Sequence, residues 1–157
     1  MKQSNESFQE SLEVGHKAEA LVTKMFTNAG YMVQDIGGSP INGKYPHVDL
    51  CITGFHTLWV EVKCRKLYNG YLDYDWLDER NIEQLAKLHM DTEIPPYIVL
   101  VAYEETLDNE PIYIITYIIS VYRARTIGGF IMIKDMMLLD RWLVKAREHK
   151  DKWRAII

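Results

Sequence analysis

The sequence predicts an α/β domain with a central mixed β-sheet flanked by α-helices. Apolar residues recur at helical spacing in three segments, and five runs with alternating or continuous apolar residues lie between these segments. The expected order is helix, three strands, helix, two strands, helix, which builds a sheet covered by helices. With 157 residues and no internal repeat or low-complexity segment, we expect residues 1–157 to form a single domain.

The first helix is expected over residues 6–29, with Gly30 as its C-terminal stop. On a helical projection Glu19 lies at the border of the apolar stripe, so its carboxylate faces the sheet and needs a partner. A solvated glutamate at the rim, or a structural ion pair, would explain this position equally well. A short strand is expected next, over residues 31–36.

A hairpin is expected from two runs, 47–53 and 58–65, joined by the loop 54–57. In the second run Glu61 and Lys63 share one face, opposite the aliphatic residues. Asp49 shares that face only if paired residue numbers add up to an even value. Two carboxylates and an ammonium would then converge on one patch, which suits a divalent metal acting on a phosphodiester.

The second half of the chain is expected to complete the sheet with strands 97–103 and 112–122 and helices 78–90 and 135–148. Three groups of residues in the polar connections and helices have both a functional and a structural interpretation. Tyrosines in the connection 66–75 could stack on nucleic-acid bases or pack on the surface. Acidic residues at the start of the helix 78–90 could bind metal or cap the helix, and basic residues at the end of the helix 135–148 could bind phosphates or complement the helix dipole. These residues are Tyr68, Tyr71 and Tyr74; Asp73, Asp75, Asp78 and Glu79; and Arg141, Lys145, Arg147, Lys150, Lys152 and Arg154.

Composition excludes several classes of protein. Two cysteines, Cys51 and Cys64, are too few for a disulfide framework or a four-cysteine metal site. No apolar run reaches the roughly 20 residues of a membrane span, and residues 1–13 are too polar for a secretory signal, so we expect a cytoplasmic protein without membrane association. The net charge of −4 argues against indiscriminate nucleic-acid binding, but a nuclease needs only a basic contact surface.

The pattern Gly15-x-x-x-Glu19 on a helix, Asp49 on a strand and Glu61-x-Lys63 on the next strand resembles the PD-(D/E)xK nuclease superfamily. Within that superfamily, of restriction endonuclease-like fold, it is most similar to the archaeal Holliday junction resolvases. The resemblance covers residues 13–88. Val48 stands where the superfamily motif has proline, and the four cysteines of the iron–sulfur members are absent.

The resemblance implies specific roles for the residues that match the motif. Asp49, Glu61 and the carbonyl of Val62 would bind Mg²⁺ or Mn²⁺, and Lys63 would position the attacking water or stabilise charge on the scissile phosphate. Glu19 would hold a water on the metal or a second ion. The remaining candidates are Gln84, a catalytic residue on the second helix, and two nucleic-acid contacts, Arg65 and Lys66.

The expected function is therefore that of a Mg²⁺-dependent deoxyribonuclease that acts as a homodimer on branched, duplex or single-stranded DNA. The alternative is a catalytically inactive nucleic-acid-binding or assembly subunit that retains the nuclease fold. A purely structural role is the alternative for Asp49, Glu61 and Lys63, whose charges could form an ordinary ion pair across the two strands.

Overall fold

The structure is a computed structural model that describes residues 4–36, 48–69, 74–76, 79–126 and 130–149. Its helices are α1 Ser4–Asn28, α2 Glu79–Thr92, α3 Val121–Thr126 and α4 Leu139–Glu148, with a 3-10 turn, η2, at Ile133–Asp135. Its strands are β1 Met32–Asp35, β2 Leu50–Thr53, β3 Leu58–Lys66, β4 Tyr74–Trp76, β5 Pro96–Glu105, β6 Pro111–Ser120, β7 Phe130–Met132 and β8 Met137–Leu138.

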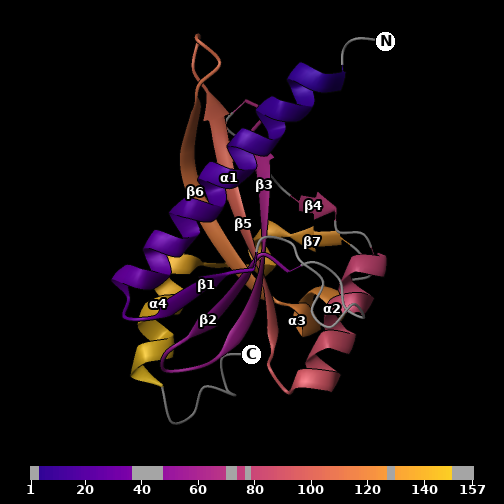
Figure 1. Cartoon of the computed structure of the whole chain (residues 1–157), viewed down its shortest axis with the longest axis vertical. Helices are drawn as coiled ribbons and strands as arrows, with labels where there is room; N and C mark the ends of the chain where they lie inside the picture. Colours follow the sequence, from indigo (N-terminus) through magenta and orange to yellow (C-terminus); the bar gives the residue numbers. More distant parts are fainter. Residues whose placement is uncertain (1–3, 37–47, 70–73, 77–78, 127–129, 150–157) are drawn as a thin grey trace.

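Six strands form one mixed sheet in the order β1-β2-β3-β5-β6-β8 (Figure 1). The pair β3–β5 is parallel and the other pairs are antiparallel. The chain crosses from β3 to β5 through α2, as a parallel pair requires a long connection. The predicted α/β architecture, a mixed sheet with flanking helices, is therefore confirmed.

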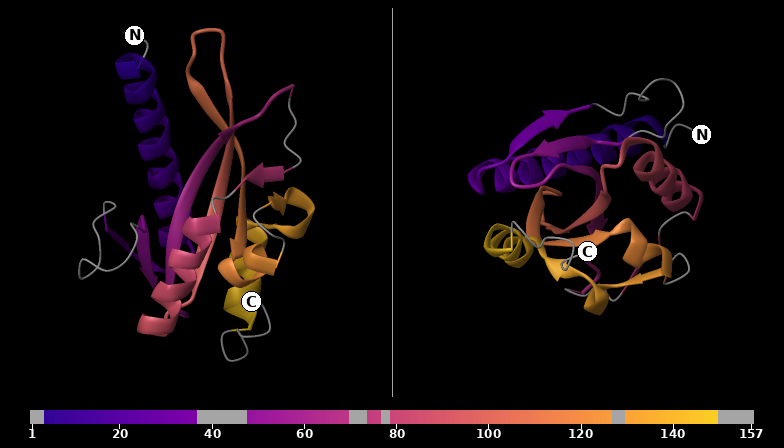
Figure 2. Two further views of the ribbon diagram at one scale, coloured as in Figure 1. Left: turned by 90° about the vertical axis from the view of Figure 1, so that its right-hand side faces the viewer. Right: turned by 90° about the horizontal axis from the view of Figure 1, so that it is seen from below.

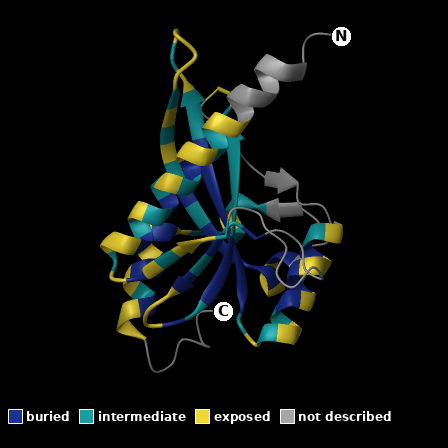
Figure 3. Cartoon of the chain, viewed as in Figure 1, coloured by how far each residue is buried: buried dark blue, intermediate teal, exposed yellow. Residues whose placement is uncertain are grey.

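Each face of the sheet has its own apolar core (Figures 1 and 2). On one face α1 and α4 pack through residues such as Phe26 and Trp142, whose rings meet edge to face at 6.2 Å. On the other face α2 and α3 pack around Trp59 and Ile98. Along β6 the exposed positions lie in its first half, toward the turn of the β5–β6 hairpin, and its last residues are buried (Figure 3).

Three parts of the second half of the chain differ from the expectation. The strand expected over residues 112–122 ends at Ser120, whose hydroxyl accepts a hydrogen bond from the Arg123 amide and so caps α3. The helix expected to begin at Asp135 begins at Leu139, because Met137 and Leu138 pair with β6 first. The connection 66–75 contains the start of β4, which pairs with β7 in a separate ribbon.

Among the residues that the structure describes, no helix is long and apolar enough to cross a membrane. The side chains of Tyr71, Tyr74, Asp73, Asp75, Asp78 and Glu79, and residues Lys150, Lys152 and Arg154, lie outside the described part.

Candidate active site

The β2–β3 hairpin has the register that brings Asp49, Glu61 and Lys63 to one face. Leu50 pairs with Val60 and Ile52 with Leu58, so paired residue numbers add up to an even value. The turn between the strands passes close to a neighbouring ring, because a side chain at Gly54 would lie 2.7 Å from Tyr31 Cδ1. A hairpin with this register places position 49 opposite position 61, as the sequence interpretation required.

Asp49 lies at a bend immediately before β2 begins. Its Oδ2 accepts a hydrogen bond of 2.7 Å from the backbone amide of Val62. In a regular sheet the Val62 amide would donate to a main-chain carbonyl of the neighbouring strand. Because β2 begins only after Asp49, the Asp49 carboxylate accepts this hydrogen bond instead. This bond fixes the Asp49 side chain between the two strands of the hairpin.

Glu61 and Lys63 project side by side from β3, two residues apart on the same face. Lys63 Nζ lies 3.3 Å from Glu61 Oε1, and the two side chains are 24% and 12% exposed. The other carboxylate oxygen, Glu61 Oε2, is buried and has no hydrogen-bond partner among the described residues. A buried carboxylate oxygen without a partner is costly unless a cation or a proton satisfies it.

Glu19 reaches this group of residues from α1 and shares a side-chain hydrogen bond with Asp49. Burial, followed by the negative charges of Asp49 and Asp35, raises the pKa of Glu19 from 4.5 to about 7. The hydrogen bond raises the pKa of Glu19 and lowers that of Asp49, so the two carboxyl groups titrate as a coupled pair. The border position predicted for Glu19 therefore lets its side chain reach Asp49, immediately before β2.

The other two carboxylates are also harder to ionise than usual. Burial, followed by the charge of Asp49, raises the pKa of Glu61 from 4.5 to about 7 in spite of Lys63. Burial raises the pKa of Asp49 as well, although the Val62 amide and the Lys63 charge oppose this. Three carboxyl groups thus share one ammonium, and the site has an excess of negative charge when all are ionised.

These residues fit a divalent cation. Carboxylate oxygens are the ligands that Mg²⁺ and Mn²⁺ prefer, Glu61 Oε2 has no partner in the described part of the chain, and the charge of Asp49 acts on the Glu61 carboxyl group. In the part of the chain that the structure describes, no three acidic, histidine or cysteine side chains are arranged to surround a metal ion as they stand. Mg²⁺ usually needs only one or two carboxylates, with water and substrate phosphate as its other ligands.

Gln84, Arg65 and Lys66 are the remaining predicted site residues, and Arg65 and Lys66 have partners of their own. Gln84 is exposed on α2, and no hydrogen bond among the described residues joins it to Glu61. Arg65 is half-buried and donates from Nη1 to the Cys64 carbonyl at 3.1 Å. Lys66 pairs with Glu105 at 2.9 Å, so a phosphate would have to compete with that carboxylate.

Sequence reasoning did not single out Asp35, whose charge acts on both Glu19 and Asp49. It ends β1, where it pairs with Leu50 next to Asp49. Together with Glu19 and His16 it lines a hollow of about 320 Å³ between α1 and β1. The available signal was weak, because an aspartate at the end of a short strand is common in turns.

No model of a known protein family matches the sequence, and no curated protein matches it. Among solved structures, the chain is similar to the 1.6 Å structure of Hjc, a Holliday junction resolvase from the archaeal hyperthermophile Archaeoglobus fulgidus. The TM-score is 0.57 at 13% sequence identity, and the match covers 82% of this chain and 99% of the resolvase chain. At this identity the similarity concerns the arrangement of helices and strands, and the chain therefore has an α/β fold of the restriction endonuclease-like type.

Proposed function

We propose that this protein is a metal-dependent deoxyribonuclease that hydrolyses phosphodiester bonds in DNA. The observation that carries the proposal is the convergence of Glu19, Asp49, Glu61 and Lys63 at the β2–β3 hairpin. The nuclease-like fold supports it further, since the structurally similar chain is a Holliday junction resolvase. Branched DNA is accordingly the first substrate to test.

Asp49 and Glu61, with the Val62 carbonyl, would hold Mg²⁺ or Mn²⁺, which supplies charge neutralisation for the scissile phosphate. The Val62 amide keeps the Asp49 carboxylate in one orientation before substrate arrives. Lys63 is partly exposed, so its ammonium can contact a phosphate oxygen or orient the attacking water. With a pKa of about 7, Glu19 can accept or release a proton near neutral pH.

The direct test is incubation of the purified protein with branched, duplex and single-stranded DNA, with Mg²⁺, with Mn²⁺ and with a chelator. We expect metal-dependent cleavage of at least one substrate by the wild type and no cleavage by Glu61→Gln. Glu83→Gln is the matched control, because Glu83 is exposed on α2 and its replacement should leave the rate unchanged. Failure of the wild type on every substrate, or full activity of Glu61→Gln, would reject the proposal.

The alternative is a nucleic-acid-binding or assembly subunit without catalytic activity. It is favoured by the geometry of the described residues, among which no three acidic, histidine or cysteine side chains are arranged to hold a metal ion. Calorimetric titration with Mg²⁺ separates the two functions, because an inactive subunit has no need to bind the ion at millimolar concentration. Heat that disappears in Glu61→Gln would assign the ion to this site.

We also propose that the protein acts as a homodimer whose interface includes the outer edge of β6. Strand β8 pairs only with Tyr117 and Ile118, so residues 111–116 of β6 have no strand neighbour there among the described residues. This stretch contains no charged residue, although edge strands are usually protected by charges. Ile112 and Ile114 are 50% and 51% exposed, which leaves a substantial apolar surface in water.

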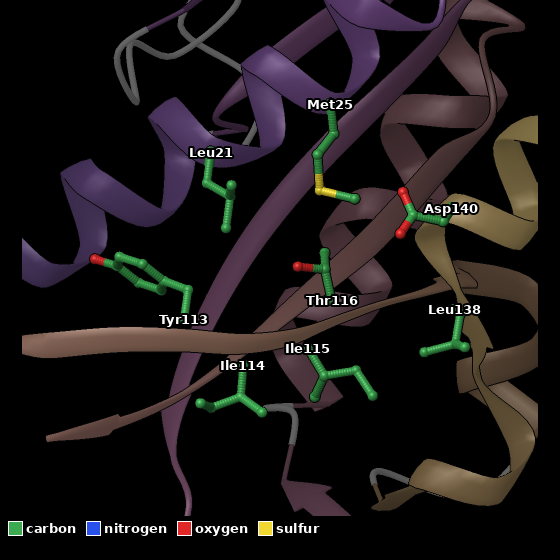
Figure 4. Close-up of a pocket in the computed structure, with 8 residues that line it drawn as sticks. All are labelled: Leu21, Met25, Tyr113, Ile114, Ile115, Thr116, Leu138 and Asp140. Atoms are coloured by element: carbon green, nitrogen blue, oxygen red, sulfur yellow. The ribbon is translucent and has the colours of Figure 1, made fainter.

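The same surface contains a hollow of about 350 Å³ beside Ile114, lined mainly by apolar side chains together with Thr116 and Asp140 (Figure 4). Leu21 and Met25 project from α1 toward β6 on one side of it, and Tyr113 and Thr116 line the other. A patch that offers both a projecting isoleucine and a hollow is suited to a second copy of itself across a two-fold axis. The register shift in β6 leaves Ile114 without a partner on β5, so its side chain is available for this contact.

Sedimentation equilibrium measures this assembly independently of catalysis. We expect the wild type to be a dimer at micromolar concentration and Ile114→Lys to be a monomer with unchanged far-ultraviolet circular dichroism. Val144→Lys is the control, since Val144 is similarly exposed on α4 but lies outside the hollow. A monomeric wild type, or a dimeric Ile114→Lys, would contradict the proposed interface.

A further inference from the structure

A second hollow, of about 300 Å³, lies at the β8 end of the sheet. Helix α3 borders it on one side and α4 on the other, and the turn η2 closes it between them. Four of its lining residues are basic and one is acidic. They are Arg123, Lys134, Arg141, Lys145 and Asp135.

This concentration of positive charge is unusual for the chain. The net charge of the whole protein is −4, yet the hollow has an excess of three positive charges. Arg141 and Lys145 are four residues apart, so they lie on the same side of α4. No ion pair or side-chain hydrogen bond within the described part of the chain involves Lys134, Arg141 or Lys145. These three cations are therefore available to an anionic partner.

The shape of the hollow favours a passing chain of phosphates over a small enclosed ligand. Lys134, Leu138 and Arg141 are exposed, so the hollow is a depression of the surface. Sites for small ligands usually enclose most of the ligand surface and are mainly apolar. A nucleic-acid backbone needs neither enclosure nor an apolar wall, because cations that neutralise its phosphates supply most of the binding free energy.

The hollow lies level with the candidate active site along the strands. Lys63 on β3 pairs with Leu100 on β5, Leu100 pairs with Tyr117 on β6, and Tyr117 pairs with Leu138 on β8. Tyr117 and Leu138 both line the hollow. Three strand spacings of about 4.8 Å place it about 14 Å from Lys63 across the sheet. Leu100 between them is buried, so the hollow is separate from the carboxylate site and does not extend it.

We propose that this hollow is a second DNA-binding site that holds a phosphodiester backbone three strands away from Lys63. The inference rests on the proposed deoxyribonuclease function. It assigns the affinity for DNA mainly to the β8 end of the sheet, because the carboxylates of the active site repel phosphates until a cation is bound. The separation of about 14 Å along the sheet corresponds to roughly four base pairs at about 3.4 Å each.

The test compares DNA binding by the wild type and by the triple variant Lys134→Ala/Arg141→Ala/Lys145→Ala. Binding to a labelled duplex is measured by fluorescence anisotropy in a chelator, at several salt concentrations, so that no cleavage occurs. We expect the triple variant to bind roughly tenfold or more weakly, with a salt dependence lower by about 0.9 per lost phosphate contact. The control is Lys24→Ala/Lys87→Ala, which removes two exposed lysines on other surfaces and should bind like the wild type.

Single-turnover cleavage at saturating DNA supplies a second readout. The triple variant should reach the wild-type rate once DNA is saturating, because its substitutions do not touch the carboxylate site. Equal affinity of the triple variant and the wild type, or equal losses in the triple variant and the lysine control, would overturn the proposal. Because the binding measurement needs no activity, a failed nuclease assay and a failed second binding site give different results.

Discussion

The β2–β3 hairpin and the β8 end of the sheet differ in net charge and in the contacts of their charged side chains. At the β2–β3 hairpin, carboxylates outnumber the single ammonium and are half-buried, with side chains bonded to the backbone or to one another. At the β8 end, cations outnumber the single carboxylate and point from exposed or half-buried positions. The residues compared are Glu19, Asp49, Glu61 and Lys63 on one side, and Arg123, Lys134, Asp135, Arg141 and Lys145 on the other.

The difference indicates a division of tasks within one small domain. Catalysis by a metal ion and a lysine needs fixed geometry, so its residues are half-buried and linked by hydrogen bonds and an ion pair. Affinity for a phosphate backbone needs only positive charge within reach, so exposed lysines and arginines are sufficient. Variants of the carboxylate site should therefore change the rate of cleavage, and variants of the basic hollow should change the affinity for DNA.

The largest expected effect comes from Lys63→Met, which removes the ammonium while keeping a side chain of similar length. We expect the single-turnover rate to fall by roughly 10³-fold, because the phosphate charge that develops during cleavage loses its nearest cation on the protein. DNA affinity in a chelator should stay within about twofold, because most phosphate contacts lie elsewhere. Quench-flow kinetics and anisotropy measure the two quantities separately. A variant that loses affinity and keeps its rate would reverse the assigned tasks.

The next effect is a pH dependence of stability that arises only from the carboxylate side. The pKa values of Glu19 and Glu61 rise from 4.5 to about 7 on folding, so the folded protein binds more protons than the unfolded chain in this window. Their contribution to stability is complete below about pH 4.5 and is lost as the pH rises through about 7. Metal-free protein should therefore melt at a higher temperature at pH 5.5 than at pH 8.

Differential scanning calorimetry of the wild type and Glu61→Gln checks this dependence. The variant should show a smaller change between the two pH values, because glutamine has no proton to gain. Mg²⁺ should raise the melting temperature more at pH 8 than at pH 5.5, since its ligands must be deprotonated. If the metal-free wild type is more stable at pH 8 than at pH 5.5, the raised pKa values of Glu19 and Glu61 are contradicted.

The smallest expected effect is the change in stability caused by Gly54→Ala at the hairpin turn. The new methyl group would lie 2.7 Å from Tyr31, whose ring is held edge to face by Phe26 and Phe55 at 5.6 and 5.7 Å. Overpacking of this kind costs about 1–3 kcal/mol of unfolding free energy, measured by urea denaturation. Because the turn sets the register at Asp49, cleavage should also slow while DNA affinity stays constant. An unchanged urea midpoint would show that Tyr31 moves aside freely.

Much of the fold could be predicted because its signals are local. Apolar periodicity predicted the first helix, the strands of the main sheet that follow it and the parity of β3, and these agree with the structure. The predicted start of α4 and the predicted end of β6 were wrong, because both boundaries depend on contacts with residues far away in the sequence. Met137 and Leu138 look helical in sequence, yet they pair with Tyr117 and Ile118 of β6. The short ribbon of β4 and β7 likewise joins segments more than fifty residues apart.

By itself the sequence determined which residues face the same side of each strand and helix, since side-chain direction follows from the backbone repeat. It thereby put Glu61 and Lys63 on one face and Glu19 toward the sheet, and the resemblance to the nuclease superfamily joined them with Asp49 as one set. Only the tertiary structure decided that Asp35 lies beside that set and that Lys134 meets Arg141 and Lys145 in one hollow. Those neighbours come from separate elements brought together by packing and strand pairing, and no local repeat in the chain encodes the distance between them.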